Sequence, residues 1–323
     1  MSRRTPTDPA ELLALAREHD RVALARLLSM VERGGEAGLE VARLAYRGDI
    51  PYTVGLTGAP GAGKSTMTDR LITAARAGWP DPAPEPVDQV GVLAVDPTSP
   101  FSGGAILGDR VRMGQHALDA SVFIRSMATR GHLGGLALAV PDAVRVLGAA
   151  GLPMVFIETV GVGQMEVEIA SAADTTVVVV TPGWGDSMQA NKAGLLEIAD
   201  LFVINKADRP GAREARRDLE QMLDLSTPRD WRPKVVDTTA TNGEGMEELW
   251  AEIARHRSHL LSTGELVQRR AERLAHELRR VLQARSWARI DELASGEEFT
   301  SAVKALAAGE IDPYAAADRL LGS

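Results

Sequence analysis

Apolar residues recur along this chain with two different periods, and the change of period divides it into distinct regions. Residues 9–47 place apolar side chains three to four positions apart, which predicts helices that break at Gly34 and Gly35. The centre holds short, β-branched and almost continuously apolar runs, typical of strands covered on both faces. These predicted strands are Thr53–Thr57, Val90–Val95, Val122–Ser126, Met154–Glu158, Thr175–Thr181, Leu201–Asn205 and Lys234–Thr238.

Helical spacing separates the predicted strands, and this alternation indicates an α/β fold with a mostly parallel sheet. Three regions are therefore expected. They are an N-terminal helical extension over 1–50, an α/β domain over 51–260 and a C-terminal helical arm over 261–323.

The C-terminal arm carries its own apolar stripe. Its first helix repeats leucine and valine at helical spacing, as in Leu274, Leu278 and Leu282, and shorter helices are predicted at Phe299–Ala308 and Asp312–Leu321. Such helices either cover the sheet or pack against another subunit. We favour the second interpretation for the arm, which predicts a homodimer, and leave both open for the N-terminal helices.

Composition excludes several classes of function. The 323 residues carry a formal charge of −8, which argues against nucleic acid as the main partner. The chain has no cysteine, so disulfides, thiolate catalysis and cysteine-based metal sites are excluded. No apolar run approaches the ~20 residues that span a bilayer, and the N-terminus lacks the apolar stretch of a signal peptide. We therefore expect a cytoplasmic protein with no membrane partner.

The strongest motif follows the first predicted strand. Gly58-Ala59-Pro60-Gly61-Ala62-Gly63-Lys64-Ser65-Thr66 matches G-x-x-x-x-G-K-[ST], and a predicted helix comes directly after it. Glycines let backbone N–H groups turn inward around phosphates, and the helix offers them its positive N-terminus. Lys64 is expected to reach the β- and γ-phosphates, and the Ser65 hydroxyl to bind Mg²⁺. The alternative is a glycine-rich turn without a ligand, and the strand before the motif and the helix after it favour the phosphate loop.

A second motif, Asn205-Lys206-Ala207-Asp208, ends a later apolar strand, at the edge where ligands bind in open α/β sheets. The Asp208 carboxylate can accept both the ring N–H and the exocyclic amine of guanine, and adenine lacks that N–H. Alone, N-K-x-D also fits a strand-to-helix turn with an asparagine cap. Placed after a phosphate loop it predicts guanine binding, with the following loop, Thr239-Ala240-Thr241, closing over the base.

Magnesium and the hydrolytic water require carboxylates, and three are candidates. Asp96 and Glu158 each end a predicted strand, so both are expected at the ligand edge of the sheet, and Asp109 is a third candidate. Each could instead be a capping or solvated side chain. We expect Lys64, Asp96 and Glu158 to be catalytic.

Two further segments are candidate switches that respond to the γ-phosphate. Gly161 and Gly163 follow Glu158 closely and could bring N–H groups to that phosphate, with Gln164 beside them. The segment Gly183–Gly194 is long for a strand-to-helix connection and holds Lys192, one of five lysines among 36 basic residues. A plain loop with a capped helix is the alternative for this second segment.

Taken in order, these segments resemble the MeaB/ArgK/MMAA family of P-loop GTPases over nearly the whole chain. The resemblance rests on GAPGAGKST (58–66), VDPTSPFSGGAILGDRVRM (95–113), IRSMATRGHLGGLA (124–137), IETVGVGQMEVEIA (157–170), NKAD (205–208) and GEIDPYAAADRLL (309–321). Two departures stand out. The guanine-closing loop begins with Thr239 where the family more often has Ser-Ala, and the second switch carries Trp184, Ser187 and Met188 at variable positions.

The resemblance implies GTP hydrolysis, with GTP or GDP and Mg²⁺ bound, coupled to protection and reloading of an adenosylcobalamin-dependent acyl-CoA mutase, usually methylmalonyl-CoA mutase. It also implies a homodimer through the C-terminal helices and a switch over Asp186–Lys192, which includes Gln189. The residues that it implies around Mg²⁺ are Ser65, Asp96, Asp109 and Glu158. Two other classes share this phosphate cradle. A P-loop kinase or ATPase of the ArgK type would need an acceptor pocket with a base, and a metallochaperone GTPase generally carries segments rich in histidine or cysteine.

Overall fold

The computed structural model describes residues 7–80, 86–96, 116, 119–128, 135–159, 172–184, 192–227 and 230–322. The chain divides into two compact units, Met1–Arg273 and Leu274–Ser323. The first contains the sheet and the second is helical.

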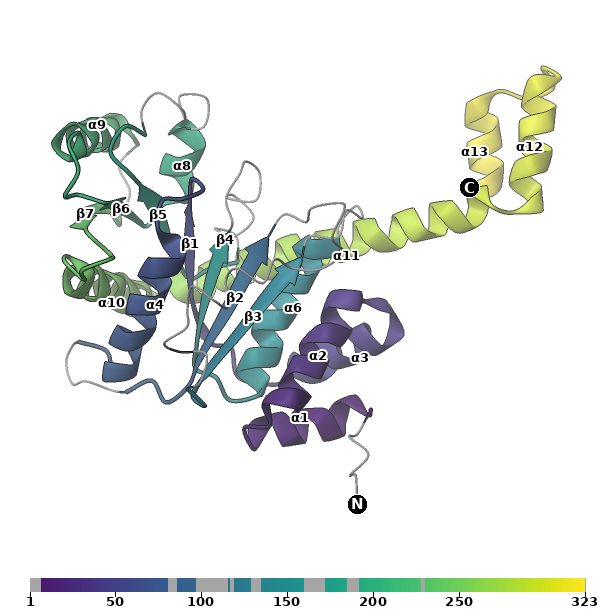
Figure 1. Cartoon of the computed structure of the whole chain (residues 1–323). Helices are drawn as coiled ribbons and strands as arrows, with labels where there is room; N and C mark the ends of the chain where they lie inside the picture. Colours follow the sequence, from purple (N-terminus) through teal and green to yellow (C-terminus); the bar gives the residue numbers. More distant parts are fainter. Residues whose placement is uncertain are drawn as a thin grey trace. The chain divides into compact units, whose positions relative to one another are not determined.

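In the first unit the described residues form a seven-stranded parallel sheet in the order β3-β2-β4-β1-β5-β6-β7 (Figure 1). The strands are β1 (Tyr52–Gly58), β2 (Val90–Asp96), β3 (Val122–Ala128), β4 (Met154–Thr159), β5 (Thr175–Val180), β6 (Leu201–Asn205) and β7 (Lys234–Thr238). Because all neighbours are parallel, the carboxyl ends of the strands meet at one edge, with β1 in the middle. The predicted α/β class and all seven predicted strands are confirmed.

Helices cover both faces of this sheet (Figure 1). Those of the first unit are α1 (Pro9–Arg17), α2 (Arg21–Arg33), α3 (Gly35–Ala45), α4 (Lys64–Ala77), α6 (Gly135–Ala149), α8 (Lys192–Ile198), α9 (Ala212–Leu225) and α10 (Met246–Thr263). A long helix, α11 (Glu265–Ala294), begins in the first unit and ends in the second.

The alternation of side chains along β5 shows how the two faces are covered. Val177 and Val179 belong to the apolar cluster that contains α4 and α10. Val178 and Val180 point the other way and pack with α8 and α9. All six residues of β5 are buried, which is why this strand is β-branched throughout and ends in four consecutive valines.

The N-terminal helices extend the layer formed by α6. Apolar side chains of α1, α2 and α3 share one cluster with α6 and with alternate residues of β2, β3 and β4. Asp20 caps α2 by accepting hydrogen bonds from the amides of Val22 and Ala23 at 2.8 and 3.0 Å. The predicted break is confirmed, since α2 ends at Arg33 and Gly34 takes a positive φ of 68° before α3.

Buried carboxylates tie the start of α11 to the amino-terminal edge of the sheet. Asp174, 1% exposed, precedes β5 and pairs with Arg270 at 2.7 Å and with Arg273. Asp200 precedes β6 and pairs with Arg269 at 2.9 Å. Burial alone would raise the pKa of Asp174, but the hydrogen bond from Arg270 and the charge of Arg273 outweigh it and lower that pKa. The first turns of α11 are therefore attached at the edge opposite the ligand edge.

A series of contacts between buried polar side chains crosses the same amino-terminal edge of the sheet. The Tyr52 hydroxyl lies 2.5 Å from the Thr175 hydroxyl, which lies 2.8 Å from Nδ1 of His256 on α10. Nε2 of His256 is 3.3 Å from an Asp200 oxygen. Burial, helped by the nearby charge of Arg269, lowers the pKa of His256 from 6.5 to about 3, so this imidazole is neutral at pH 7.

The second unit holds the rest of α11 with α12 (Glu297–Ala307) and α13 (Pro313–Leu321). Every residue of α11 is among those described, and none of them is buried. Large apolar side chains of this unit are exposed, among them Leu278 at 60% and Trp287 at 63%. Within the described residues, no helix combines the length and apolar character needed to cross a membrane.

Candidate functional site

The phosphate loop connects β1 to α4 at the middle of the ligand edge. Gly58 ends β1 with φ 140°, and a side-chain carbon there would lie 2.0 Å from the carbonyl oxygen of Val179, so glycine is required. Gly61 and Gly63 have φ of 74° and 99°, the left-handed region that glycine favours. Helix α4 then begins at Lys64, so its amino-terminal N–H groups face the loop.

Lys64 lies within this loop and not out in solvent. Its ammonium donates to the carbonyl oxygens of Gly58 at 2.6 Å and Ala59 at 3.0 Å, and the residue is only 6% exposed. These hydrogen bonds hold the start of the phosphate loop in place, and the ammonium adds a positive charge to it. Together with the loop amides and the start of α4, it makes a positively polarised cradle of the kind that binds phosphate.

Glu158, near the end of β4, reaches the first turn of α4. Ser65 Oγ donates to one carboxylate oxygen of Glu158 at 2.7 Å, and Thr68 Oγ1 lies 2.8 Å from the other. Glu158 is 1% exposed. The structure thus brings together two predicted metal-binding residues, Ser65 and Glu158. Thr68 was missed by sequence reasoning, although its position one turn after Ser65 puts both on one face of the helix.

Asn205 joins the two predicted halves of the site. Its amide nitrogen donates to the carbonyl oxygen of Ala62 at 2.7 Å. Its oxygen accepts from the Thr238 hydroxyl at 3.2 Å and from the Ala240 amide at 3.1 Å. The side chain is 3% exposed. The phosphate loop and the predicted guanine-closing loop are therefore held together by one buried amide.

Lys206 and Asp208 follow on the turn after β6. Lys206 has a positive φ of 62°, and its ammonium donates to the carbonyl oxygen of Gly61 at 2.8 Å. Asp208 is exposed and so is accessible to a ligand. The next loop bends back on itself, with Thr239 forming an antiparallel bridge to Glu244. The predicted segments at 58–66, 205–208 and 239–241 therefore meet at one edge of the sheet.

A second residue that sequence reasoning missed also connects these segments. Arg70, on α4, donates from Nε to the carbonyl oxygen of Ala240 at 3.3 Å and from a terminal nitrogen to that of Thr241 at 3.0 Å. It holds the predicted guanine-closing loop against α4, the helix that follows the phosphate loop. Nothing in the local sequence distinguishes Arg70 from other surface arginines of this arginine-rich chain.

Several predicted residues cannot be placed. Asp109, Gly161, Gly163, Gln164, Asp186 and Gln189 lie outside the described residues. Asp96 is the last residue of β2, which neighbours β4 in the sheet, so its backbone lies at the ligand edge. Lys192 is the first residue of α8. The side chains of both are outside what is described.

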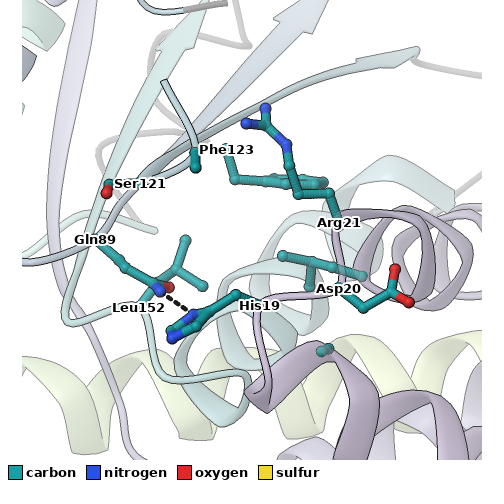
Figure 2. Close-up of a pocket in the computed structure, with 10 residues that line it drawn as sticks. His19, Asp20, Arg21, Gln89, Ser121, Phe123 and Leu152 are labelled. Carbon is teal, nitrogen blue, oxygen red and sulfur yellow. Dashed lines mark hydrogen bonds between the residues drawn. The ribbon is translucent and has the colours of Figure 1, made fainter. Parts of the chain in front are cut away.

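One small pocket lies away from this site (Figure 2). Gln89, which immediately precedes β2, contacts His19 there, and Arg21 lies over the ring of Phe123 on β3 at 5.9 Å from its centroid. Ser121, just before β3, lines the same pocket. The pocket thus lies at the amino-terminal edge, opposite the phosphate loop, and is not part of the candidate site.

Comparison with known proteins gives a consistent result. The family model described as "Methylmalonyl Co-A mutase-associated GTPase MeaB" matches residues 24–294. A Pyrococcus abyssi protein that carries the name GTPase is 47% identical, covering 96% of this chain and 95% of that protein. GTPase ArgK of Escherichia coli K12 is 34% identical over 84% of this chain and 82% of its own. A solved structure titled LAO/AO transport system kinase shares the fold, with a TM-score of 0.68 at 24% identity and 99% coverage of both chains.

Proposed function

The chain belongs to the MeaB family of methylmalonyl-CoA mutase-associated GTPases, and on this premise we propose that it hydrolyses GTP to GDP and phosphate to regulate an adenosylcobalamin-dependent acyl-CoA mutase. One observation carries the nucleotide part of the proposal. The buried amide of Asn205 binds the phosphate loop at Ala62 and the guanine-closing loop at Ala240. A guanine nucleotide fits this arrangement, with its phosphates at the phosphate loop and its base at the guanine-closing loop.

At the base end, the exposed carboxylate of Asp208 accepts the ring N–H and the exocyclic amine of guanine. Lys206 donates a hydrogen bond to the carbonyl oxygen of Gly61 in the phosphate loop. Arg70 donates hydrogen bonds to the carbonyl oxygens of Ala240 and Thr241 in the guanine-closing loop. Adenine offers no N–H for the second hydrogen bond to the carboxylate. Selectivity for guanine over adenine therefore depends on Asp208, while its neighbours keep the loops in place.

At the phosphate end, the loop amides, the start of α4 and Lys64 supply positive potential for the β- and γ-phosphates. The donors present also fit Mg²⁺, because the Ser65 hydroxyl and the Glu158 carboxylate are adjacent hard oxygen ligands. When bound, this ion would neutralise charge that develops on the phosphates during hydrolysis. Asp96 is proposed as a further catalytic carboxylate, since β2 ends beside β4.

The regulatory part of the proposal rests on the family and on the topology. Strands β4 and β5 flank β1, and each leads directly into a proposed switch segment, after Thr159 and after Val180 respectively. Nucleotide state would thus reach the partner through these two segments. We further propose a homodimer formed by the exposed apolar side chains of the C-terminal unit.

Calorimetric titration tests the nucleotide part. The protein with Mg²⁺ should bind GTP and GDP and show no comparable binding of ATP or ADP. Asp208→Asn should weaken GDP binding by tenfold or more, about 1.4 kcal/mol, while thermal unfolding stays unchanged. Asp218→Asn, an exposed aspartate on α9, is the matched control and should bind as the parent does. A protein that ignores guanine nucleotides would refute the assignment.

The partner is tested separately with purified acyl-CoA mutases that use adenosylcobalamin. The rate of phosphate release from GTP should change when the cognate mutase is added, and the two proteins should co-elute. If no such mutase alters the rate or binds, the regulatory role fails while the nucleotide assignment stands.

A further inference from the structure

Thr68 is fully buried in α4 and lies between the phosphate loop and the sheet. Its hydroxyl is 2.8 Å from an oxygen of Glu158 and 3.0 Å from the carbonyl oxygen of Lys64 in the preceding turn. Its exposure is 0%. The hydroxyl has one hydrogen to donate and two acceptors within reach, and an ionised carboxylate is the stronger acceptor.

Glu158 is consequently held by two hydroxyls of one helix. Ser65 engages one carboxylate oxygen at 2.7 Å and Thr68 engages the other. Because the two contacts fall on different oxygens, they fix the rotation of the carboxylate as well as its position. At 1% exposure, Glu158 has little water available to replace either contact.

The contact with Glu158 also determines what Ser65 can offer. A serine hydroxyl has one hydrogen and two lone pairs. Once its hydrogen is directed at Glu158, the lone pairs face elsewhere and are available to a cation. Partners of this kind orient the direct ligands of a metal and commonly change metal affinity by about 10- to 100-fold.

We propose that Thr68 is a positioning residue for the magnesium end of the nucleotide site. It holds Glu158, which is itself a proposed ligand of the Mg²⁺ that accompanies the nucleotide, and Glu158 in turn orients the hydroxyl of the other proposed ligand, Ser65. Thr68 itself touches neither nucleotide nor metal. This inference rests on the proposed function, because it specifies how the proposed GTP site binds its metal.

The competing explanation is purely structural. A threonine inside a helix can satisfy its hydroxyl on the carbonyl four residues earlier, here that of Lys64, without any role at the site. Both explanations predict some loss of stability when the hydroxyl is removed. They differ in whether nucleotide binding changes only when Mg²⁺ is present.

The test compares Thr68→Val, which keeps the shape, with Thr68→Ser, which keeps the hydroxyl. The dissociation constant of GDP is measured with Mg²⁺ and again with excess EDTA. Thr68→Val should bind GDP within about twofold of the parent in EDTA. With saturating nucleotide, its half-saturating Mg²⁺ concentration should rise about tenfold. Thr68→Ser should retain the Mg²⁺ dependence of the parent.

Each other outcome overturns the inference. Equal weakening of GDP binding by Thr68→Val in both conditions would indicate general damage to the cradle. Loss of Mg²⁺ dependence in Thr68→Ser would show that the hydroxyl is not the determinant. Thr68→Ala is measured in parallel in case valine impairs folding, and it should behave as valine does. A parent protein that binds no guanine nucleotide would instead refute the proposed function, through a different measurement.

Discussion

Gly61 and Gly63 of the phosphate loop differ in how much space an added side chain would have. At Gly63 an added carbon would lie 2.2 Å from the amide nitrogen of Asn205, whereas at Gly61 nothing lies within 4 Å. Both have a positive φ, so both share the strain that a non-glycine residue suffers there. Comparing the two positions separates backbone strain from loss of the contact made by Asn205.

Gly61→Ala should destabilise the protein by about 1 kcal/mol, the cost of placing alanine in the left-handed region. Gly63→Ala should cost about 2 kcal/mol more, because it displaces Asn205 from the carbonyl of Ala62 and leaves buried polar groups unpaired. Chemical denaturation of both variants measures the difference. Equal destabilisation would mean that Asn205 adjusts without losing its hydrogen bonds.

At the scale of elements, the attachment of α11 depends on few charges. Asp174 is buried and pairs with Arg270 and Arg273, while its backbone amide and carboxylate also bind Thr53 of β1. Removing one partner of a buried ion pair leaves the other charges uncompensated, which costs more than the pair contributes.

Asp174→Asn should therefore destabilise the first unit by about 3 kcal/mol at pH 7. Its native pKa is lowered, so this stabilisation is present above the ordinary value of 3.8 and is lost as pH falls below it. The difference between parent and variant in denaturant unfolding should shrink accordingly in acid. Glu292→Gln, in an exposed pair with Arg289, is the control and should change stability by less than about 0.5 kcal/mol.

Burial of His256 also predicts that stability falls in acid, but here the folded protein favours the neutral form of the side chain, whereas for Asp174 it favours the charged form. The native pKa of His256 is about 3, so between pH 6.5 and 3 the unfolded chain binds a proton that the folded chain does not, and stability falls as pH falls. His256→Gln removes this effect. The free-energy difference between parent and variant should be about 1 kcal/mol smaller at pH 5.5 than at pH 7. A difference that is constant with pH would contradict the neutral buried imidazole. His276→Gln, at an exposed position on α11, controls for loss of an imidazole.

Most strands could be predicted because each is a short, mainly apolar run ended by polar or glycine residues. The exception to this pattern is β7 at the edge of the sheet, where Lys234 and Asp237 are exposed. The spatial order of the strands could not be predicted, since nothing within β1 specifies that β4 and β5 are its neighbours. The same limit applies to the site. The segment 58–66 and Asn205 carry recognisable spacing, whereas Thr68 and Arg70 act through contacts with residues 90 and 170 positions away. Contacts at such separation leave no local pattern.

At the scale of the whole molecule, the C-terminal unit exposes several large apolar side chains. Leu278, Leu282 and Trp287 on α11 are each more than half exposed, as is Tyr314 on α13. Contiguous apolar surface on a protein commonly marks an interface with another chain. Replacing Leu278 and Leu282 together by glutamate should convert the proposed dimer to a monomer and leave GDP affinity unchanged. Light scattering after gel filtration measures the mass, and a parent protein that is already monomeric would exclude the proposed dimer.

The central place of β1 has a consequence for how the protein is made. Tyr52 pairs with Met154, and Val54 with Thr175, so both neighbours of β1 are synthesised more than 100 residues after it. Parallel pairing at such separation forms slowly, because a long loop must close before any contact is gained. The residues of the phosphate loop therefore emerge early from the ribosome. The strand that carries them, β1, cannot pair with both of its neighbours until β5 has been synthesised. The hydrogen bond from Asn205 to the carbonyl oxygen of Ala62 in this loop can form only later, after β6 has been synthesised. A nascent chain shorter than this carries the nucleotide motif without the capacity to use it.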